Sequence, residues 1–250
     1  MMSSAANRFI SNEQAIPVIE TDIFRGNSDM PLAITRLNTE DVMSGGDPVA
    51  LAYTQLRANV YINQTGMISP SNRQNDGGER DSDDPRSVHF ASLENRGDGR
   101  AAVVGAIRLI HKTDASPENL PIEDLFFDPD NGINEIVADT GSFEVSRYIS
   151  INDNRRRARL TKVAVIGAGL AHAVESKWTP CFAVVEPCVE RDLSRTGVPI
   201  GRIAEPKLIE KYNDTNVAIE VYLDEYVRRL GKPAVSNMYL QEHGVRFYGK

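Results

Sequence analysis

The segment GSFEVSRYIS, residues 141–150, decides the fold that we expect for this chain. β-Branched and aromatic residues dominate it and turn-forming residues bound it, which predicts a β-strand. Burying either of its charges alone would cost several kcal/mol, so Glu144 and Arg147 must lie in an ion-pair network or in a solvated cleft. An edge strand with an ordinary surface ion pair is the alternative. Alternation gives the strand two mixed faces: Phe143, Val145 and Arg147 on one, and Glu144, Ser146 and Tyr148 on the other.

A second strand, residues 101–111, is apolar apart from Arg108 and its terminal histidine, which predicts a central strand that is buried on both faces. Because a guanidinium group cannot lose its charge, Arg108 needs a carboxylate partner. The candidates are Asp81, Asp84 and Glu144. Gly105 in the same strand indicates a bulge or the close approach of another group.

The remaining elements follow from hydrophobic spacing and from turn signals. Asp47 and Pro48 open a helix as cap and first residue, and Gly66 is a plausible end. Residues 94–100 predict a somewhat long hairpin loop, and residues 120–127 a short helical turn with exposed charges. Further strands are expected at 32–37, 87–93, 182–185 and 218–223, and further helical segments at 155–175, 188–196 and 225–230.

This order of elements predicts an α/β protein with helices on the faces of its sheet. We expect one domain over residues 31–230. Residues 1–30 are expected to form a partly disordered N-terminal arm, and residues 231–250 a C-terminal tail.

Composition narrows the class of protein. The 250 residues carry a formal net charge of −7, which argues against general nucleic-acid binding. No apolar run approaches the ~20 residues that a membrane span needs, and no signal peptide is visible at the start. The two cysteines, Cys181 and Cys188, fit no zinc spacing and suit a reducing cytoplasm, the expected location.

Several sites of known chemistry are disfavoured. The acidic segment 69–86 is a long loop, which favours a functional or disordered segment, but it lacks the ligand spacing of a calcium-binding EF-hand. The four histidines have no metal-ligand spacing, so no metal site is expected. The two glycines of the GAG sequence at 167–169 lie in mid-helix without a strand leading into them, which argues against dinucleotide binding.

A basic cluster opens the helix expected at 155–175. Cations at a helix N-terminus oppose the helix dipole, so the cluster suggests an anionic partner, either a phosphate group or an acidic protein. A solvated helix start is the alternative. Its members are Arg155, Arg156, Arg157, Arg159 and Lys162.

Taken together, the motifs resemble the acyl-homoserine-lactone synthase (autoinducer synthase) family, a branch of the GNAT acyltransferases. The resemblance runs over about residues 51–223 and depends on the order and spacing of its parts. They are the sequence LR at 56–57 followed by Tyr61, ERDSDD at 79–84, GAIRL at 105–109 and FEVSRY at 143–148.

The resemblance implies a three-layer α/β/α GNAT-like sandwich whose central mixed sheet splays into a V-shaped cleft. An acyl-phosphopantetheine thioester would lie in this cleft, carried by acyl carrier protein or by coenzyme A. The amine acceptor would be S-adenosylmethionine or an amino acid. No permanently bound cofactor is implied. The family's motif positions map to Arg57, Tyr61 (usually Phe), Asp81, Asp84, Arg108, Glu144 and Arg147, and the basic cluster would meet the carrier protein.

The residue types also suit the transfer of an acyl group to an amine, independently of the resemblance. A protonated amine is not nucleophilic, so a carboxylate must take its proton, and Glu144 is the candidate base. Backbone N–H groups of splayed strands would hold the developing oxyanion. Ser146 and Arg147 join Glu144 as catalytic candidates, and the expected substrate-binding residues are Arg57, Tyr61, Asp81, Asp84, Arg108 and Phe143.

The sequence departs from the family pattern at two places, and the identity of the amine acceptor is therefore not decided. The tryptophan that usually follows the first helix is absent, and Met67 lies near its position. The N-terminal arm is longer than is usual. Related synthases that acylate free amino acids share the fold, so an N-acyl amino acid is a second candidate product. The alternatives to catalysis are a GNAT-like protein that binds an acyl thioester or a carrier protein without turnover, and an interaction domain whose acidic loop docks a partner.

Overall fold

The computed structural model of the chain describes residues 16–24, 30–128, 133–134, 136–151, 155–195, 197–212, 214–230 and 245–248. The chain gathers into two compact units, which we name by their strands. The β2–β4 unit comprises residues 9–108, 147–169 and 234–250, and the β8–β11 unit comprises residues 1–8, 109–146 and 170–233. Strands β4 (Arg100–His111) and β7 (Phe143–Ser150) and helix α4 (Arg155–Glu175) contribute residues to both units.

The strands of the β2–β4 unit follow the order β7-β4-β3-β2-β12, and β1 pairs with β4. Strand β2 is antiparallel to β3 and parallel to β12. The strands predicted at 32–37, 87–93 and 101–111 are confirmed. Strands β1 and β12 lie in the segments expected as an arm and a tail, and no sequence pattern predicted them. The bounds are β1 Val18–Glu20, β2 Leu32–Leu37, β3 Ser87–Gly97 and β12 Val245–Tyr248.

The hairpin between β3 and β4 has a two-residue turn instead of the long loop that we predicted. Asp98 and Gly99 have φ angles of 53° and 72°. Two central residues with positive φ form the turn whose twist matches that of the flanking strands, and an aspartate followed by glycine favours it. The strands therefore extend through polar residues that looked like loop.

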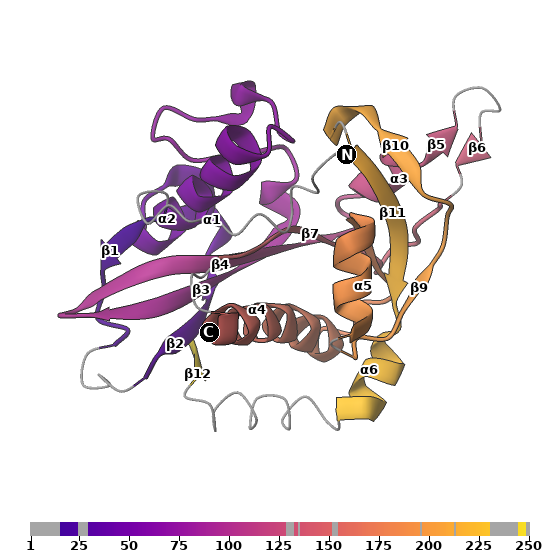
Figure 1. Ribbon diagram of the computed structural model, residues 1–250. Helices are drawn as coiled ribbons and strands as arrows, with labels where there is room; N and C mark the ends of the chain where they lie inside the picture. The colour runs from indigo at the N-terminus through magenta and orange to yellow at the C-terminus, as the bar shows by residue number, and fades with distance from the viewer. Residues whose placement is uncertain are drawn as a thin grey trace. The chain divides into compact units, whose positions relative to one another are not determined.

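Helices α1 and α2 lie on one face of these strands, and α4 lies on the other face (Figure 1). The predicted cap of α2 is confirmed, because Asp47 Oδ1 accepts hydrogen bonds from the backbone of Val49 at 2.8 Å and of Ala50 at 3.0 Å. The helix continues as a π-helix and ends before Gly66. The helical segments are α1 Thr39–Ser44, α2 Pro48–Arg57, the π-helix η3 Ala58–Gln64, and the short 3-10 helices η4 Pro70–Asn72 and η5 Asp84–Arg86.

The strands of the β8–β11 unit follow the order β10-β11-β8-β7-β4, and β9 also pairs with β11. Strand β8 is parallel to β7 and antiparallel to β11, so the sheet is mixed. The bounds are α3 Pro121–Leu125, β5 Phe127–Asp128, β6 Ile133–Asn134, β8 Cys181–Val185, α5 Pro187–Arg195, β9 Ile200–Arg202, β10 Lys207–Ile209, η6 Glu210–Tyr212, β11 Asp214–Val221 and α6 Leu223–Leu230.

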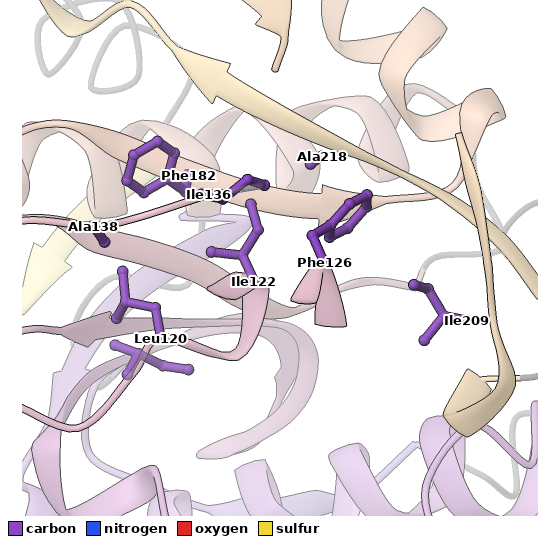
Figure 2. Close-up of a cluster of buried hydrophobic side chains, with 9 residues drawn as sticks. Leu120, Ile122, Phe126, Ile136, Ala138, Phe182, Ile209 and Ala218 are labelled. Carbon is purple, nitrogen blue, oxygen red and sulfur yellow. The ribbon is translucent and has the colours of Figure 1, made fainter. Parts of the chain in front are cut away.

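Alternate residues of β8 and β11 face two apolar cores. Phe182 and Ala218 belong to a cluster that includes α3 residues, shown in Figure 2, whereas Ala183 and Ile219 belong to a cluster that packs against Leu193 of α5. This period of two is what a sheet covered on both faces requires. The predicted α/β fold with helices on both faces is confirmed; the V-shaped splay of the sheet stays a prediction.

The helical turn after residue 120 differs from the prediction in one respect. Asp124 is exposed as expected, but Glu123 is buried. Its carboxylate is compensated by an ion pair with Lys112. The alternation expected along β7 is also interrupted, because Arg147 has a φ of 51°, in the left-handed region that a regular strand does not use.

Candidate active site

Arg57 at the end of α2 is the centre of a buried ion-pair network in the β2–β4 unit. Its side chain is 0 % exposed. Its guanidinium donates to both oxygens of Asp84, at 2.8 and 3.1 Å, and through Nε to Glu79 Oε2 at 2.5 Å. A guanidinium group matches a carboxylate in this two-bonded geometry, which fixes orientation as well as distance.

Arg108 of β4 supplies the second buried cation, with its side chain 1 % exposed. Its Nη1 donates to Asp84 Oδ1 at 2.9 Å and to Asp81 Oδ1 at 2.5 Å. Two of the three carboxylates that the sequence proposed as partners therefore bind it. The prediction that this central strand carries a compensated charge is confirmed.

Arg147 of β7 closes the network. Its Nη2 donates to Glu79 Oε1 at 3.0 Å and to Asp81 Oδ2 at 2.6 Å. Three guanidinium groups and three carboxylates thus alternate around a closed ring with no net charge, in the order Arg57, Glu79, Arg147, Asp81, Arg108, Asp84. We call these six residues the charged ring.

The loop that supplies the carboxylates is ordered by its own backbone. Asp84 Oδ2 accepts from the N–H of Asp81 at 2.9 Å, and Asp81 Oδ1 accepts from the N–H of Asp83 at 3.0 Å. The N–H of Glu79 donates to the carbonyl of Thr54 in α2 at 3.0 Å. The acidic segment is therefore a structural element that connects α2 to β4 and β7.

The electrostatics of the charged ring shift the pKa values of Asp84, Asp81 and Arg108. Burial alone would raise the pKa of Asp84, but the adjacent guanidinium groups of Arg57 and Arg108 more than offset this and hold the pKa well below its usual range. The pKa of Asp81 is lowered by Arg108 and Arg147 against the same opposing effect of burial. For Arg108, burial opposes the charge and the neighbouring carboxylates raise the pKa above its ordinary value.

Two uncharged side chains, His89 and Tyr53, are hydrogen-bonded to each other next to the charged ring. His89 Nε2 lies 3.2 Å from the carbonyl oxygen of Asp84, and Nδ1 lies 3.1 Å from the hydroxyl of Tyr53. Because a carbonyl oxygen only accepts, Nε2 must carry the hydrogen and Nδ1 must accept from Tyr53. Burial lowers the pKa of His89 to about 4 despite the nearby Asp84 carboxylate.

Tyr61 lies beside the charged ring, on η3. Its hydroxyl donates to the carbonyl of Tyr148 at 2.8 Å, and the guanidinium of Arg147 lies 5.5 Å from the centre of its ring. This distance allows a cation–π interaction. The hydrogen bond uses the hydroxyl that distinguishes tyrosine from the family's usual phenylalanine, and it ties η3 to β7.

The catalytic candidates on β7 before Arg147 belong to the β8–β11 unit. Glu144 is 3 % exposed, and its Oε2 accepts from the N–H of Ile122 at 2.7 Å. Phe143 is fully buried, with its ring centre 6.0 Å from that of Trp178, and Ser146 is half-buried. The structure thus places Glu144 and Arg147 on one strand, as predicted.

The basic cluster on α4 is partly described. Arg157 is exposed and donates to Glu94 of β3 at 2.7 Å, Arg159 is exposed, and Lys162 is half-buried. The side chains of Arg155 and Arg156 lie outside the described residues. Glu94 therefore offsets part of the positive charge.

Sequence reasoning missed the burial of Glu79 and of Glu123, among other carboxylates. Glu79 is fully buried and bridges two arginines of the charged ring, whereas the sequence indicates it only as the first residue of the ERDSDD motif. Glu123 is 2 % exposed and was expected on the surface. For Glu79 the excess of buried arginines over assigned carboxylates was the available signal; for Glu123 a glutamate three residues after Leu120 at a helix start was a weak one.

The described part of the chain holds no group of three or more residues suited to a metal ion. Within the same residues, no helix is both long enough and apolar enough to cross a membrane.

Comparison with solved structures places this fold among the acyl-homoserine lactone synthases. The CoA-dependent acyl-homoserine lactone synthase BjaI, solved with SAM and isopentyl-CoA, is 21 % identical, with a TM-score of 0.56, and the match covers 88 % of this chain and 94 % of that one. LasI is 18 % identical, with a TM-score of 0.55 over 77 % and 89 % of the two chains. TofI, in a ternary complex with an inhibitor and MTA, is 19 % identical, with a TM-score of 0.57 over 82 % and 100 %. No curated protein matches the chain.

These structures define the class of protein by its fold, the mixed α/β fold of the acyl-homoserine lactone synthases. The family follows from the sequence profile of the autoinducer synthases, which matches residues 54–229. The chain belongs to the autoinducer synthase family, and it is an acyltransferase. The matched span contains every member of the charged ring and Glu144.

Proposed function

We propose that this enzyme moves an acyl group from a phosphopantetheine thioester to the primary amine of S-adenosylmethionine or of an amino acid, with Glu144 as the general base. The donor is acyl carrier protein or coenzyme A. With S-adenosylmethionine as acceptor, the carboxylate of the acylated product then attacks the methylene carbon bound to the sulfonium, the carbon–sulfur bond breaks, methylthioadenosine leaves, and an acyl-homoserine lactone forms. No cofactor is permanently bound.

The observation that carries this proposal is the arrangement of β7. The strand presents a buried carboxylate, Glu144, three residues before an arginine that the charged ring fixes in a left-handed conformation. A buried carboxylate and a backbone held outside the regular strand conformation cost free energy, and such features are found mainly at functional sites.

The chemistry assigns each step to a group. The ammonium group of the acceptor loses a proton to the Glu144 carboxylate, directly or through one water. The free amine attacks the thioester carbonyl, and the oxyanion that forms is stabilised by backbone N–H donors of β7, beside Ser146. The carbon–sulfur bond then breaks, and the thiol of the phosphopantetheine arm leaves as the amide forms.

The charged ring is assigned a supporting part in substrate binding. Its six members bind one another, so the ring fixes the acidic loop and the side chain of Arg147 in place. Tyr61 provides apolar surface on η3, and Phe143, which is fully buried, supports β7 by packing beneath it. The exposed cations Arg157 and Arg159, with Lys162, bind the acidic carrier protein or the phosphates of coenzyme A.

A direct assay shows which of the two donors and which of the two acceptor classes the enzyme uses. Purified enzyme is incubated with acyl carrier protein thioesters or acyl-CoA thioesters of graded chain length, each with S-adenosylmethionine or with a panel of amino acids. Mass spectrometry identifies the N-acyl product, and thiol release measures the rate. We expect one donor and acceptor pair to give amide and thiol in equal amounts. Thioester binding without amide formation over the whole panel would overturn the proposal.

A further inference from the structure

A second buried ion pair lies in the β8–β11 unit, outside the charged ring. Lys112 Nζ donates to both carboxylate oxygens of Glu123, at 3.0 and 2.9 Å. The same two oxygens accept from the backbone N–H groups of Leu120 at 2.8 Å and of Ala138 at 3.0 Å. The carboxylate therefore accepts four hydrogen bonds, two of them from backbone groups on either side of α3.

Helix α3 has only five residues, so it cannot hold its own position through helical hydrogen bonds. Its apolar side chains fix one side: Figure 2 shows Leu120, Ile122 and Phe126 in the apolar cluster with Phe182 and Ala218. The Glu123 carboxylate fixes the backbone at the start of the helix. The N–H of Ile122, between these two anchors, points to Glu144 Oε2 at 2.7 Å.

The bonds form a closed circuit that returns to β7. The N–H of Lys112 donates to the carbonyl of Ser142 at 3.0 Å, and the carbonyl of Lys112 accepts from Gly141 at 2.9 Å. Residues 141 and 142 lead directly into the strand that carries Glu144. The circuit thus runs from Glu144 through Ile122, Glu123 and Lys112 and back along the chain to Glu144.

We propose that Glu123 and Lys112 are positioning residues for the Glu144 carboxylate. By fixing α3 from both sides, they keep the Ile122 N–H aimed at Glu144, which orients its proton-accepting oxygens and favours the ionised form. The inference rests on the proposed function for its catalytic consequence, but the positioning of the carboxylate is a separate physical claim.

The physical reason is the cost of a buried carboxylate. A charged group at 3 % exposure is disfavoured unless hydrogen-bond donors are already in place. The Ile122 N–H is such a donor, and it stabilises the anion without moving. If α3 loosens, the donor moves away, and the pKa of Glu144 rises toward that of a desolvated carboxyl group.

The test measures the pKa of Glu144 directly, by NMR of enzyme labelled with ¹³C at glutamate carboxyl carbons, with Glu144→Gln to assign the signal. Glu123→Gln breaks the ion pair. The double variant Lys112→Met with Glu123→Gln removes both charges together and so leaves neither buried alone. Glu118→Gln, at an exposed position before the helix, is the matched control. In the unaltered enzyme, the amide proton shift of Ile122 is followed over the same pH range.

We expect the pKa of Glu144 to rise by about one unit in both Glu123 variants and to stay unchanged in Glu118→Gln. The acid limb of the kcat profile should move by the same amount, with little change in KM. In the unaltered enzyme the Ile122 amide proton should titrate with Glu144, a result that does not depend on any variant folding.

The outcomes separate the two claims. An unchanged Glu144 pKa in a folded Glu123 variant, or an Ile122 amide that ignores the titration of Glu144, overturns the positioning role. A raised pKa with an unmoved kcat profile supports the positioning role and overturns the assignment of Glu144 as base. If the role of Glu123 is purely structural, the Glu123 variants should be less stable, but neither the pKa of Glu144 nor the kcat profile should shift.

Discussion

At the residue scale, the charged ring makes each of its members dependent on the others. A buried ion pair adds little to stability over apolar packing, because desolvation offsets the attraction. Removing one partner is different, since it leaves a charge buried without compensation. The ring therefore favours one arrangement of the acidic loop more than it raises the free energy of unfolding.

Asp84→Asn should lower the free energy of unfolding by about 3–5 kcal/mol. Asp84 accepts from Arg57 and Arg108, both almost fully buried, so neutralising it leaves two guanidinium groups short of a partner. Urea unfolding followed by circular dichroism measures the change. Asp83→Asn is the control, because Asp83 pairs with Arg86 in a partly exposed position and lies 3.9 Å from Arg108, beyond hydrogen-bond distance. This substitution should cost about 1 kcal/mol or less. Equal effects of the two substitutions would contradict the ring as described.

His89 predicts a specific dependence of stability on pH. Burial lowers its pKa in the folded chain to about 4, from an ordinary value of 6.5; the cations Arg57 and Arg108 lower it further, and the Asp84 carboxylate opposes the shift. Between these pH values the unfolded chain binds a proton at this histidine that the folded chain does not. The free energy of unfolding should therefore fall with falling pH, by up to about 1.4 kcal/mol per unit.

The measurement compares urea unfolding at pH 7.0, 6.0 and 5.0 for the unaltered chain and for His89→Gln. The variant should be less stable at pH 7.0 but should lose less stability on acidification, because it has no proton to bind. Parallel slopes in the two proteins would show that His89 is not buried in the neutral form.

At the element scale, Gly105 makes the close packing of α4 on β3 and β4 possible. A Cβ atom at this position would lie 2.9 Å from both Ser92 Cβ and Thr161 Cγ2. Gly105→Ala should thus force these elements apart and cost about 1–3 kcal/mol in urea unfolding. Gly46→Ala, at an exposed position whose nearest neighbour is the end of a serine side chain, should change stability by less than about 0.5 kcal/mol. A neutral Gly105→Ala would refute the close approach.

The exposed start of α4 provides a test of the donor. Arg159→Glu should raise KM for an acyl carrier protein thioester several-fold, and the effect should shrink at high salt, because an exposed cation acts through a screened interaction. Arg195→Glu, the same exchange at an exposed site in α5, is the control. Unchanged KM in Arg159→Glu, or equal changes in both variants, would argue against carrier binding at α4.

At the scale of the whole molecule, sequence patterns predicted the elements better than their ends. Helix α4 and strand β2 match their predicted bounds, because hydrophobic period and turn residues both mark them; β7 ends as predicted but begins two residues later, at Phe143. The length of the loop around Asp98 and Gly99 was overestimated, since both strands continue beyond the core through polar residues. Strands β1 and β12 were missed because each depends on pairing with a distant strand.

The candidate site was predicted in its residue types and only partly in its connections. Buried arginines require carboxylates, which identified Asp81 and Asp84 as partners of Arg108. The role of Glu79 and the left-handed backbone of Arg147 arise from the three-dimensional closing of the charged ring, which no local pattern contains. The same reason hid Glu123, whose buried charge is compensated by Lys112, the residue that follows β4.

The central claim is that Glu144 takes the proton of the attacking amine, and the rate of Glu144→Gln tests it most directly. Glutamine keeps an oxygen for the Ile122 N–H but cannot accept the proton, so kcat for thioester-dependent amide formation should fall by ~10²–10⁴-fold. The urea midpoint of the variant should stay close to that of the unaltered enzyme. Full amide-forming activity in a folded Glu144→Gln variant would contradict the account.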